Sequence, residues 1–335
     1  MSEPFADKVQ RWWYDGQGGG AWLLPLSWLF GAIVSLRRLA YRRGWLRSCR
    51  PIVPVIVVGN IATGGTGKTP LVVWLVEQLQ AAGHRPAVIS RGYGGMVGKG
   101  PYRVTRATAS RDCGDEPALI ARRTDAIVVV GSDRCADAAL AVELGATVIV
   151  ADDGLQHYRL QRDIEIAVVD AERGFGNGRL LPAGPLREPQ TRLASADLVL
   201  SQVRAPADGD VFWLQGDEVV AVRDRGLKRP LASLAGETVV AMAGVGNPRR
   251  FFALLKNAGL SVEPLPLADH ALASEYALDQ WRERTVIVTE KDAVKLVSHD
   301  HPQLWYLAVD AVFARQAHER LAALLQPYTA PGAGA

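Results

Sequence analysis

The sequence has few cysteines, little net charge and no repeated unit, and each shortage narrows the possible classes of protein. Cys49, Cys113 and Cys135 are odd in number and lack metal-ligand spacing. We therefore expect reduced thiols of a cytosolic protein and no zinc site. A net charge of +3 gives no reason to expect nucleic acid as a partner. No internal repeat is visible, and 335 residues are enough for about two globular domains.

Charge is absent from one long stretch near the start. No charged residue occurs at positions 16–36, whereas six arginines follow at positions 37–50. The arginines come after the apolar run and no small-residue cleavage site is present, which argues against a signal peptide. The segment just reaches the length of a membrane span, although Pro25, Ser27 and the early glycines weaken that interpretation.

Aromatic and basic residues at the ends of this segment favour contact with a membrane. Trp12, Trp13, Trp22 and Trp28 suit the headgroup level, and the arginines attract anionic lipid. We expect residues 1–50 to be a membrane anchor that either spans the bilayer or lies in its interface, with the remaining chain on the cytoplasmic face. The alternative is an amphipathic helix packed on the protein.

Beyond Pro51, short β-branched runs alternate with helical patterns. Strands buried on both faces and separated by helices predict a mostly parallel sheet in an α/β sandwich. The stretch 206–234 contains a Gly-Asp pair between two apolar runs, which predicts a hairpin that connects two domains. We therefore expect a first domain at 51–205 and a smaller α/β domain at 235–328. The predicted strands of the first domain are 52–59, 86–90, 126–130, 147–152, 164–170 and 197–202.

A glycine-rich segment, GNIATGGTGKTP at 59–70, lies between the first of these strands and a helical pattern. Its backbone N–H groups and the following helix N-terminus suit phosphate oxygens. Lys68 is expected to reach the β- and γ-phosphates of a nucleotide, and Thr69 to ligate Mg²⁺. The segment lacks the standard first glycine, because Ala62 stands six residues before Lys68. The expected nucleotide contacts are Ala62, Thr63, Gly64, Gly65, Thr66, Gly67, Lys68 and Thr69.

Acidic residues follow two other elements. Asp152 and Asp153 end a predicted strand and are candidates for Mg²⁺, although a capped Asp-Asp-Gly turn explains them as well. His157, four residues after Asp153, contacts the nucleotide, orients a carboxylate or is structural. Asp115 precedes a helical pattern as a capping acid does. Arg91, in RGYGG, suggests a second approach of the backbone to the nucleotide.

Together these segments resemble the tetraacyldisaccharide 4'-kinases of lipid A biosynthesis in Gram-negative bacteria. The resemblance covers nearly the whole chain, and the family's loop also lacks the first glycine. One departure is Ala271, where the family often has a second histidine. The shared segments, besides the arginine-flanked start, are VGNIATGGTGKTP, SRGYGG, GDEP, DDGLQH, GNGRLLPAGPLREP, AGVGNPRRFF, ADH and TEKDAVKL.

The resemblance implies a P-loop kinase that uses ATP and Mg²⁺ to phosphorylate the 4'-hydroxyl of tetraacyldisaccharide 1-phosphate at the inner membrane. It makes Asp115 the catalytic base, in place of a capping acid, with His270 and Asp269 from the second domain beside it. The resemblance gives Lys68 a catalytic role as well. It also implies that Asp152 and Asp153 lie near Mg²⁺, His157 near the nucleotide, and Glu188 near the sugar or its phosphate. No obligate protein partner is implied.

Three other functions remain open. The first is a phosphate-loop kinase for another lipid or a soluble metabolite, the second is a membrane-linked ATPase switch, and the third is a nucleotide-binding scaffold without catalysis. Partitioning and targeting switches carry a lysine just before the paired glycines of the loop. Thr63 holds that position here, which argues against a switch.

Overall fold

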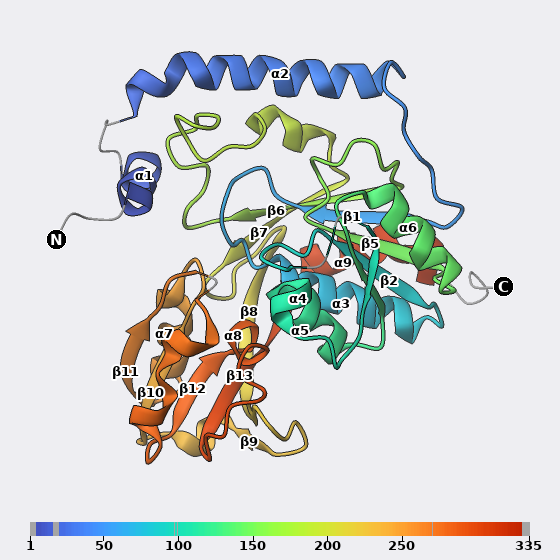
Figure 1. Ribbon diagram of the computed structural model, residues 1–335. Coiled ribbons are helices and arrows are strands. Elements are labelled where there is room, and N and C mark those ends of the chain that lie inside the picture. The colour runs from blue at the N-terminus through green and yellow to red at the C-terminus, as the bar shows by residue number, and fades with distance from the viewer. Residues whose placement is uncertain (1–4, 16–19, 97, 99, 270, 330–335) are drawn as a thin grey trace.

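The structure, a computed structural model, describes residues 5–15, 20–96, 98, 100–269 and 271–329. One sheet runs through two α/β units, which lie one above the other in Figure 1. The strand order is β11-β10-β12-β13-β8-β7-β6-β1-β5-β2-β4-β3, with β9 paired to β8. We call the part up to β7 the first unit and the part from β10 to β13 the second unit. This bears out the expected class: a mostly parallel α/β sheet with a smaller second unit and an apolar N-terminal helix.

The first unit contains the strands that the sequence predicts. All five residues of β1 are buried, as expected for a strand covered on both faces. Only β3 runs antiparallel, at the edge of the sheet beside β4. The strands are β1 (Val55–Gly59), β2 (Pro86–Ser90), β3 (Tyr102–Val104), β4 (Ile127–Val130), β5 (Val148–Asp152), β6 (Ile164–Asp170) and β7 (Leu198–Val203).

Helices cover the two faces of this sheet unequally. One face carries α3 (Lys68–Ala81), α5 (Asp115–Arg123) and α9 (Arg315–Thr329), whose apolar side chains join one core. Helix α9 comes from the C-terminal end of the chain and packs back onto α3. The other face carries α6 (Arg134–Glu143) and the irregular segments 153–163 and 171–197, which flank β6 in the chain. The short α4 (Ser110–Cys113) leads into α5.

The second unit has its own two apolar cores, one on each face of the sheet. Phe251, Phe252 and Leu255 of α7 fill one of them, and the segment 271–281 covers the other. The elements are β10 (Thr238–Ala243), α7 (Pro248–Asn257), β11 (Ser261–Pro266), β12 (Val286–Thr289), α8 (Glu290–Ala293) and β13 (Leu304–Phe313).

The predicted position of the hairpin turn, at Gly216 and Asp217, is wrong, although the stretch 206–234 contains an antiparallel pair of strands further along. Residues 211–221 form one strand, β8 (Val211–Ala221), which pairs with β7 in the first unit and β13 in the second. Strand β9 (Lys228–Pro230) follows it. Gly216 lies inside β8 at a β-bulge, where Gly216 and Asp217 together oppose Val309 of β13, and a Cβ at Gly216 would lie 2.9 Å from the Ala308 carbonyl. The glycine therefore allows close approach of two strands and does not form a turn.

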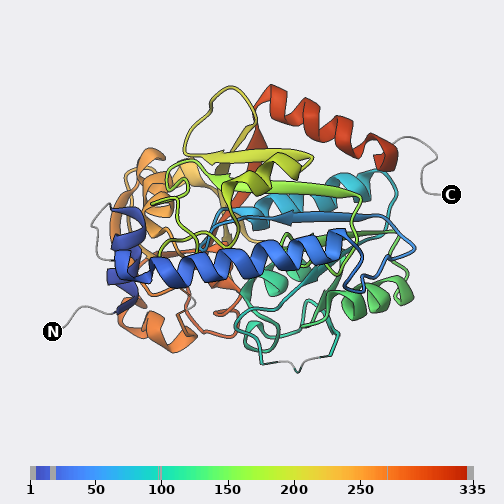
Figure 2. The ribbon, with the colours of Figure 1, turned by 90° about the horizontal axis from the view of Figure 1, so that it is seen from above.

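The N-terminal helices lie across residues 171–197 of the first unit. Helices α1 (Phe5–Tyr14) and α2 (Leu24–Arg42) are separate in space, and α2 crosses over the sheet (Figures 1 and 2). The Ser27 hydroxyl donates to the Leu180 carbonyl at 2.8 Å, and a Cβ at Gly31 would meet the Leu180 side chain at 2.7 Å. Residues 21–42, which comprise α2 and the short turn before it, are long enough to cross a bilayer, and their most apolar 18-residue window has a mean hydropathy of 1.4.

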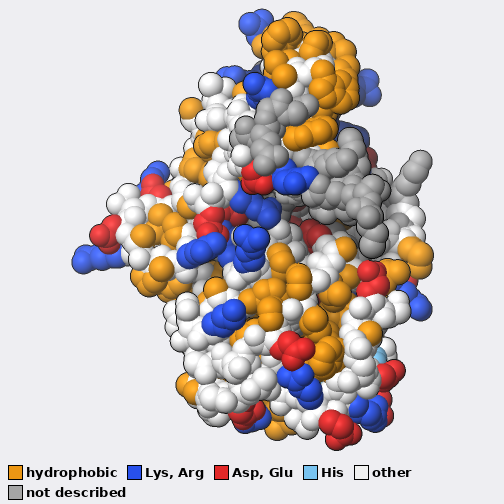
Figure 3. Space-filling view, turned by 90° about the vertical axis from the view of Figure 1, so that its left-hand side faces the viewer, with side chains coloured by type: hydrophobic (Ala, Val, Ile, Leu, Met, Phe, Trp, Pro, Cys, Tyr) orange, Lys and Arg blue, Asp and Glu red, His pale blue; other side chains and the backbone are white. Residues whose placement is uncertain are grey.

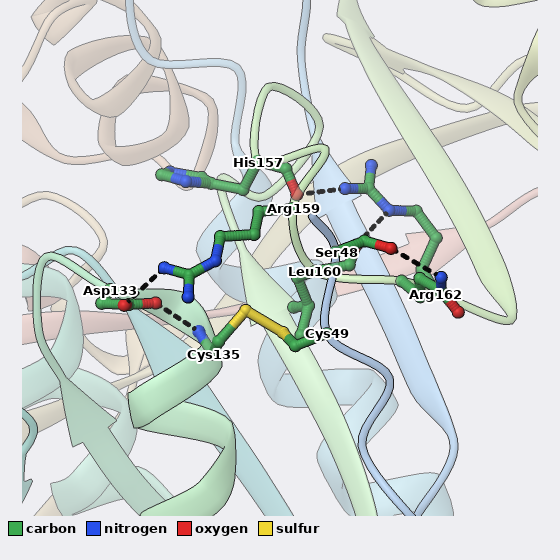
Figure 4. Close-up of a disulfide and its surroundings, with 9 residues drawn as sticks. Ser48, Cys49, Asp133, Cys135, His157, Arg159, Leu160 and Arg162 are labelled. Atoms are coloured by element: carbon green, nitrogen blue, oxygen red, sulfur yellow. Dashed lines mark hydrogen bonds and ion pairs between the residues drawn. A yellow bond between two sulfur atoms is a disulfide. The ribbon is translucent and has the colours of Figure 1, made fainter. Parts of the chain in front are cut away.

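The expectation of reduced thiols is wrong for two cysteines. Cys49 and Cys135 form a disulfide that joins the segment after α2 to the first turn of α6, whereas Cys113 is free and buried (Figure 4). Asp133 accepts from the Cys135 N–H at 2.9 Å and pairs with Arg159 at 2.7 Å. The two cysteines are 86 residues apart, and no local spacing indicates that folding brings them together.

The oxidised protein is expected to unfold at a higher temperature than the reduced protein. Closing an 86-residue loop restricts the unfolded chain and contributes up to about 4 kcal/mol. A shift of roughly 5–10 °C in the unfolding temperature follows. Thermal unfolding with and without dithiothreitol measures it. The double variant Cys49→Ser/Cys135→Ser is the control and should not respond to the reductant, and equal unfolding temperatures for the unchanged protein would contradict the pairing.

Candidate active site

The loop between β1 and α3 has the backbone of a phosphate cradle. Gly64 and Gly67 have φ angles of 108° and 70°, in the region that favours glycine. Gly67 directly precedes α3, so the helix N-terminus faces the loop. The Thr66 hydroxyl is buried without a hydrogen-bond partner among the described residues. A buried hydroxyl of this kind is suited to a phosphate oxygen.

The structure explains why Ala62 replaces the usual glycine. Ala62 is buried, keeps a negative φ and pairs across an isolated bridge with Leu186. Around it, the Thr63 N–H donates to the Pro185 carbonyl at 2.8 Å, and the Arg187 N–H donates to the Ile61 carbonyl at 2.7 Å. The entrance of the loop is therefore extended backbone, which requires no glycine.

Two adjacent carboxylates face the loop lysine. Lys68 Nζ lies 3.4 Å from Asp153 Oδ1, and Arg187 Nη1 lies 2.8 Å from Asp153 Oδ2. Burial opposes ionisation of Asp153, but the attraction of Lys68 and then of Arg187 outweighs it and holds its pKa below the usual range. Asp153 has a φ of 52°, which is rare outside glycine and is typical of functional sites. The pairing of Arg187 with Asp153 was not predicted, because the two residues lie 34 positions apart in the chain.

Asp152 differs from its neighbour. Its side chain is buried at the end of β5, and the Ser90 hydroxyl donates to Oδ2 at 3.4 Å. Burial raises the pKa of Asp152 to about 6, against the attraction of Lys68. Together with the Thr69 hydroxyl, two such carboxylates are the hard oxygen donors that Mg²⁺ prefers, and Mg²⁺ needs only one or two of them. The donor set therefore fits this ion.

Replacing Asp152 by asparagine is expected to stabilise the nucleotide-free protein at pH 8. The raised pKa means that the folded state favours the protonated carboxyl, so stability falls as the pH rises from about 4 to about 6. Asparagine removes this loss of about 3 kcal/mol. Urea unfolding at pH 5 and pH 8 measures it, with Asp125→Asn, an exposed carboxylate, as control. A variant that is less stable at pH 8 would contradict the ionisation assigned to Asp152.

Residues of the second unit meet the start of α5. Lys295 Nζ lies 3.2 Å from Asp115 Oδ2 and 3.2 Å from Asp292 Oδ1, and Lys291 Nζ lies 2.7 Å from Glu116 Oε1. Gly114 is the N-cap of α5, and Asp115 is the first residue of the helix. Asp115 is therefore a buried member of an ion pair between the units and does not occupy the N-cap position.

The two lysines were not assigned from the sequence. They occur in TEKDAVKL with a spacing of four residues, which places them on one side of a helical turn. Lys291 also lies 3.5 Å from Asp269. The predicted partner of Asp115, His270, lies outside the described residues.

The remaining predicted residues fall in different surroundings. His157 is half-buried, and burial together with Arg134 lowers its pKa to about 4, so it is neutral at pH 7 (Figure 4). Arg91 follows β2 and is exposed. Glu188 has no exposed surface, and its carboxylate accepts from the Gln156 amide at 2.8 Å and from the Tyr158 hydroxyl. Glu188 is thus buried among protein partners, and its contact with the sugar or its phosphate stays a prediction.

A phosphate loop, paired carboxylates and a second unit that closes on them define the class of ATP-dependent phosphotransferases with a P-loop. The family model described as tetraacyldisaccharide-1-P 4'-kinase matches residues 20–326. The chain belongs to this family, as the resemblance predicted.

Named relatives and one solved structure agree with this assignment. The tetraacyldisaccharide 4'-kinase of Halorhodospira halophila is 52% identical over 89% of this chain and 90% of that protein. The one of Alkalilimnicola ehrlichii is 48% identical over 90% of this chain and 92% of that protein. The crystal structure of the "apo" form of LpxK from Aquifex aeolicus in complex with ATP matches with a TM-score of 0.78 and 29% identity. The match covers 92% of this chain and 99% of the LpxK chain.

Proposed function

We propose that the protein transfers the γ-phosphate of ATP to the 4'-hydroxyl of tetraacyldisaccharide 1-phosphate, which forms lipid IVA in lipid A biosynthesis. The observation that carries this proposal is a family match over residues 20–326 in a chain whose phosphate loop faces a second unit. A Cβ at Gly246 of the second unit would lie 3.6 Å from the Gly65 nitrogen. Such an arrangement excludes water from a phosphoryl-transfer site.

The residues divide into a donor side and an acceptor side. The loop amides and Lys68 hold the β- and γ-phosphates, and Thr69, Asp152 and Asp153 hold Mg²⁺, which neutralises phosphate charge when bound. Asp115 accepts the proton of the sugar hydroxyl as the new P–O bond forms. Asp269, the residue before His270 in the chain, lies on the acceptor side, where Lys291 joins it to Glu116.

The transfer is tested with radiolabelled ATP and purified disaccharide 1-phosphate. A labelled lipid at the mobility of lipid IVA is the expected product. A labelled product with another lipid alone would indicate a kinase of different specificity. Release of inorganic phosphate without any labelled lipid would favour the ATPase switch and overturn the proposal.

The N-terminal segment suits attachment to the inner membrane, with the two units on its cytoplasmic face. Helix α2 projects from the molecule and gathers hydrophobic side chains at the top of Figure 3. Only 6% of its most apolar window is buried. The arginines that follow favour the cytoplasmic side and anionic lipid. The large exposed apolar residues on this segment are Trp22, Leu26, Trp28, Leu29, Ile33, Leu36, Leu39, Trp45 and Leu46.

Replacing two of these residues by glutamate, as in Trp28→Glu/Leu36→Glu, is expected to release the protein from membranes. Each buried apolar side chain contributes about 1.5–3 kcal/mol, so the partition coefficient should fall at least roughly 100-fold. Flotation with vesicles that contain anionic lipid measures it. Leu227→Glu, an exposed apolar residue of the β8–β9 turn, is the matched control. Deleting residues 1–50 should also release the protein, and a truncated chain that stays fully bound would contradict the anchor.

A further inference from the structure

Arg173 stands apart from the other arginines beside the phosphate loop. Arg187 pairs with Asp153, Arg250 with Asp170, and Arg204 with Glu172. The Arg173 guanidinium forms no ion pair with any residue that the structure describes. It donates to the Gly246 carbonyl of the second unit and lies 5.6 Å from the ring centre of Tyr14. Its partners are thus a neutral carbonyl and an aromatic face.

The guanidinium lies against the middle of the loop. A Cβ added at Gly64 would lie 3.2 Å from Arg173 Nη1. One pocket is lined by Ala62, Thr63, Gly65 and Thr66 of the loop together with Arg173 and Tyr14. An unpaired cation beside a cradle for polyphosphate is placed to receive negative charge, because a bidentate contact with phosphate is stronger than a bond to a neutral carbonyl.

The backbone at Arg173 is fixed by the end of β6. The Arg173 N–H donates to Asp170 Oδ1 at 3.2 Å, and the Gly174 N–H donates to the Asp170 carbonyl at 2.8 Å. Asp170 itself is buried and pairs with Arg250 of α7. The side chain of Arg173 therefore has a rigid base, and its far end reaches between the loop and the second unit.

We propose that Arg173 is an arginine supplied in cis that stabilises the phosphoryl group during its transfer. This proposal rests on the proposed kinase function. The bond between the γ-phosphorus and the β,γ-bridging oxygen breaks with its electron pair moving to ADP. The sugar oxygen bonds to phosphorus, and its proton goes to Asp115. Arg173 contacts the oxygens of the transferring group, where negative charge is shared, and returns to the Gly246 carbonyl after transfer.

The contact with Gly246 also links this arginine to the position of the second unit. When the second unit is close, as here, its carbonyl holds the guanidinium within reach of Gly64. A second unit that moves away leaves Arg173 without this hydrogen bond. The structure thus supplies a physical reason for transfer only in the closed arrangement, which limits hydrolysis of ATP.

The test compares Arg173→Ala, Arg173→Lys and the control Arg315→Ala, an exposed arginine on α9. The alanine variant is expected to lower kcat about 1,000-fold while the Kd for ATP stays within about threefold. Lysine should remain at least about 100-fold below the unchanged protein, since one ammonium does not span two phosphate oxygens. Aluminium fluoride should tighten ADP binding at least about tenfold in the unchanged protein and in the control, but not in either Arg173 variant.

The two measurements separate this proposal from the function on which it rests. If the unchanged protein forms no labelled lipid, the proposed function fails. The binding of ADP with aluminium fluoride then still decides whether Arg173 contacts the transferring phosphoryl group. If Arg173→Ala keeps more than about a third of kcat, the arginine proposal is overturned and the kinase stands. A variant that binds ATP and the ADP–fluoride complex equally weakly, with a lowered unfolding temperature, shows a structural contact only and also overturns it.

Discussion

Replacing Asp115 by asparagine is expected to lower phosphoryl transfer about 1,000-fold and to leave the Kd for ATP within about threefold. Asparagine has the same shape but accepts no proton from the sugar hydroxyl. Asp115 lies at the start of α5, where Lys295 places a positive charge 3.2 Å from its carboxylate. Lys295 keeps a second carboxylate partner, Asp292, so the variant leaves no unpaired buried lysine.

Single-turnover measurements with labelled ATP and fluorescence titration with a nucleotide analogue separate transfer from binding. Asp125→Asn is the matched control, because Asp125 is exposed and pairs only with Arg106 at the surface. Lys295→Met tests the ion pair separately. A loss of ATP binding in Asp115→Asn that parallels the loss of transfer would show that Asp115 shapes the nucleotide site. Transfer at the normal rate would remove it as the base.

Local pattern predicts most of the first unit. Runs of β-branched residues identified its parallel strands, because each strand is buried on both faces and reads as a continuous apolar run. The glycine spacing identified the phosphate loop. The predicted turn position failed because a Gly-Asp pair is also compatible with a β-bulge inside one long strand. Only the pairing of β8 with β13 shows that the glycine meets the Ala308 carbonyl.

Contacts between distant segments were not predictable. Arg187 reaches Asp153, Lys295 reaches Asp115, and Cys49 reaches Cys135, and no spacing in one segment indicates its partner in another. The same limit applies to Glu188. Its sequence neighbourhood suggested a substrate contact, but burial with Gln156 and Tyr158 becomes visible only once the chain is folded.

The N-terminal helices reach the phosphate loop in a way the sequence did not suggest. The Tyr14 hydroxyl donates to the Thr63 carbonyl at 3.3 Å, and the Trp13 indole donates to the Pro182 carbonyl at 3.1 Å. Residues 171–197 therefore lie between the N-terminal helices on one side and the loop on the other. Thr63 argued against a switch through its side chain, and in the structure its carbonyl accepts a hydrogen bond from Tyr14 of α1.

Replacing Lys68 by methionine is expected to lower transfer about 1,000-fold and, unlike the Asp115 variant, to weaken ATP binding. Methionine keeps most of the apolar stem of lysine and removes the charge that faces the β- and γ-phosphates. It also removes the contact at 3.4 Å with Asp153, whose remaining cationic partner is Arg187. Asp152 and Asp153 then face the nucleotide with less positive charge beside them. The phosphates therefore lose an attractive contact and are also repelled by the two carboxylates.

The comparison of Lys68→Met with Lys228→Met isolates this effect, because Lys228 is an exposed lysine that pairs with Glu218 at the surface. The same titration and single-turnover assay are used for both. Lys228→Met should match the unchanged protein in both measurements. If Lys68→Met bound ATP normally and lost only transfer, the lysine would act on the moving phosphoryl group alone, and the ground-state contact with the phosphates would be wrong. If Lys68→Met kept both ATP binding and transfer, the loop would not hold the phosphates, because an uncharged side chain cannot replace an ammonium group that lies next to them.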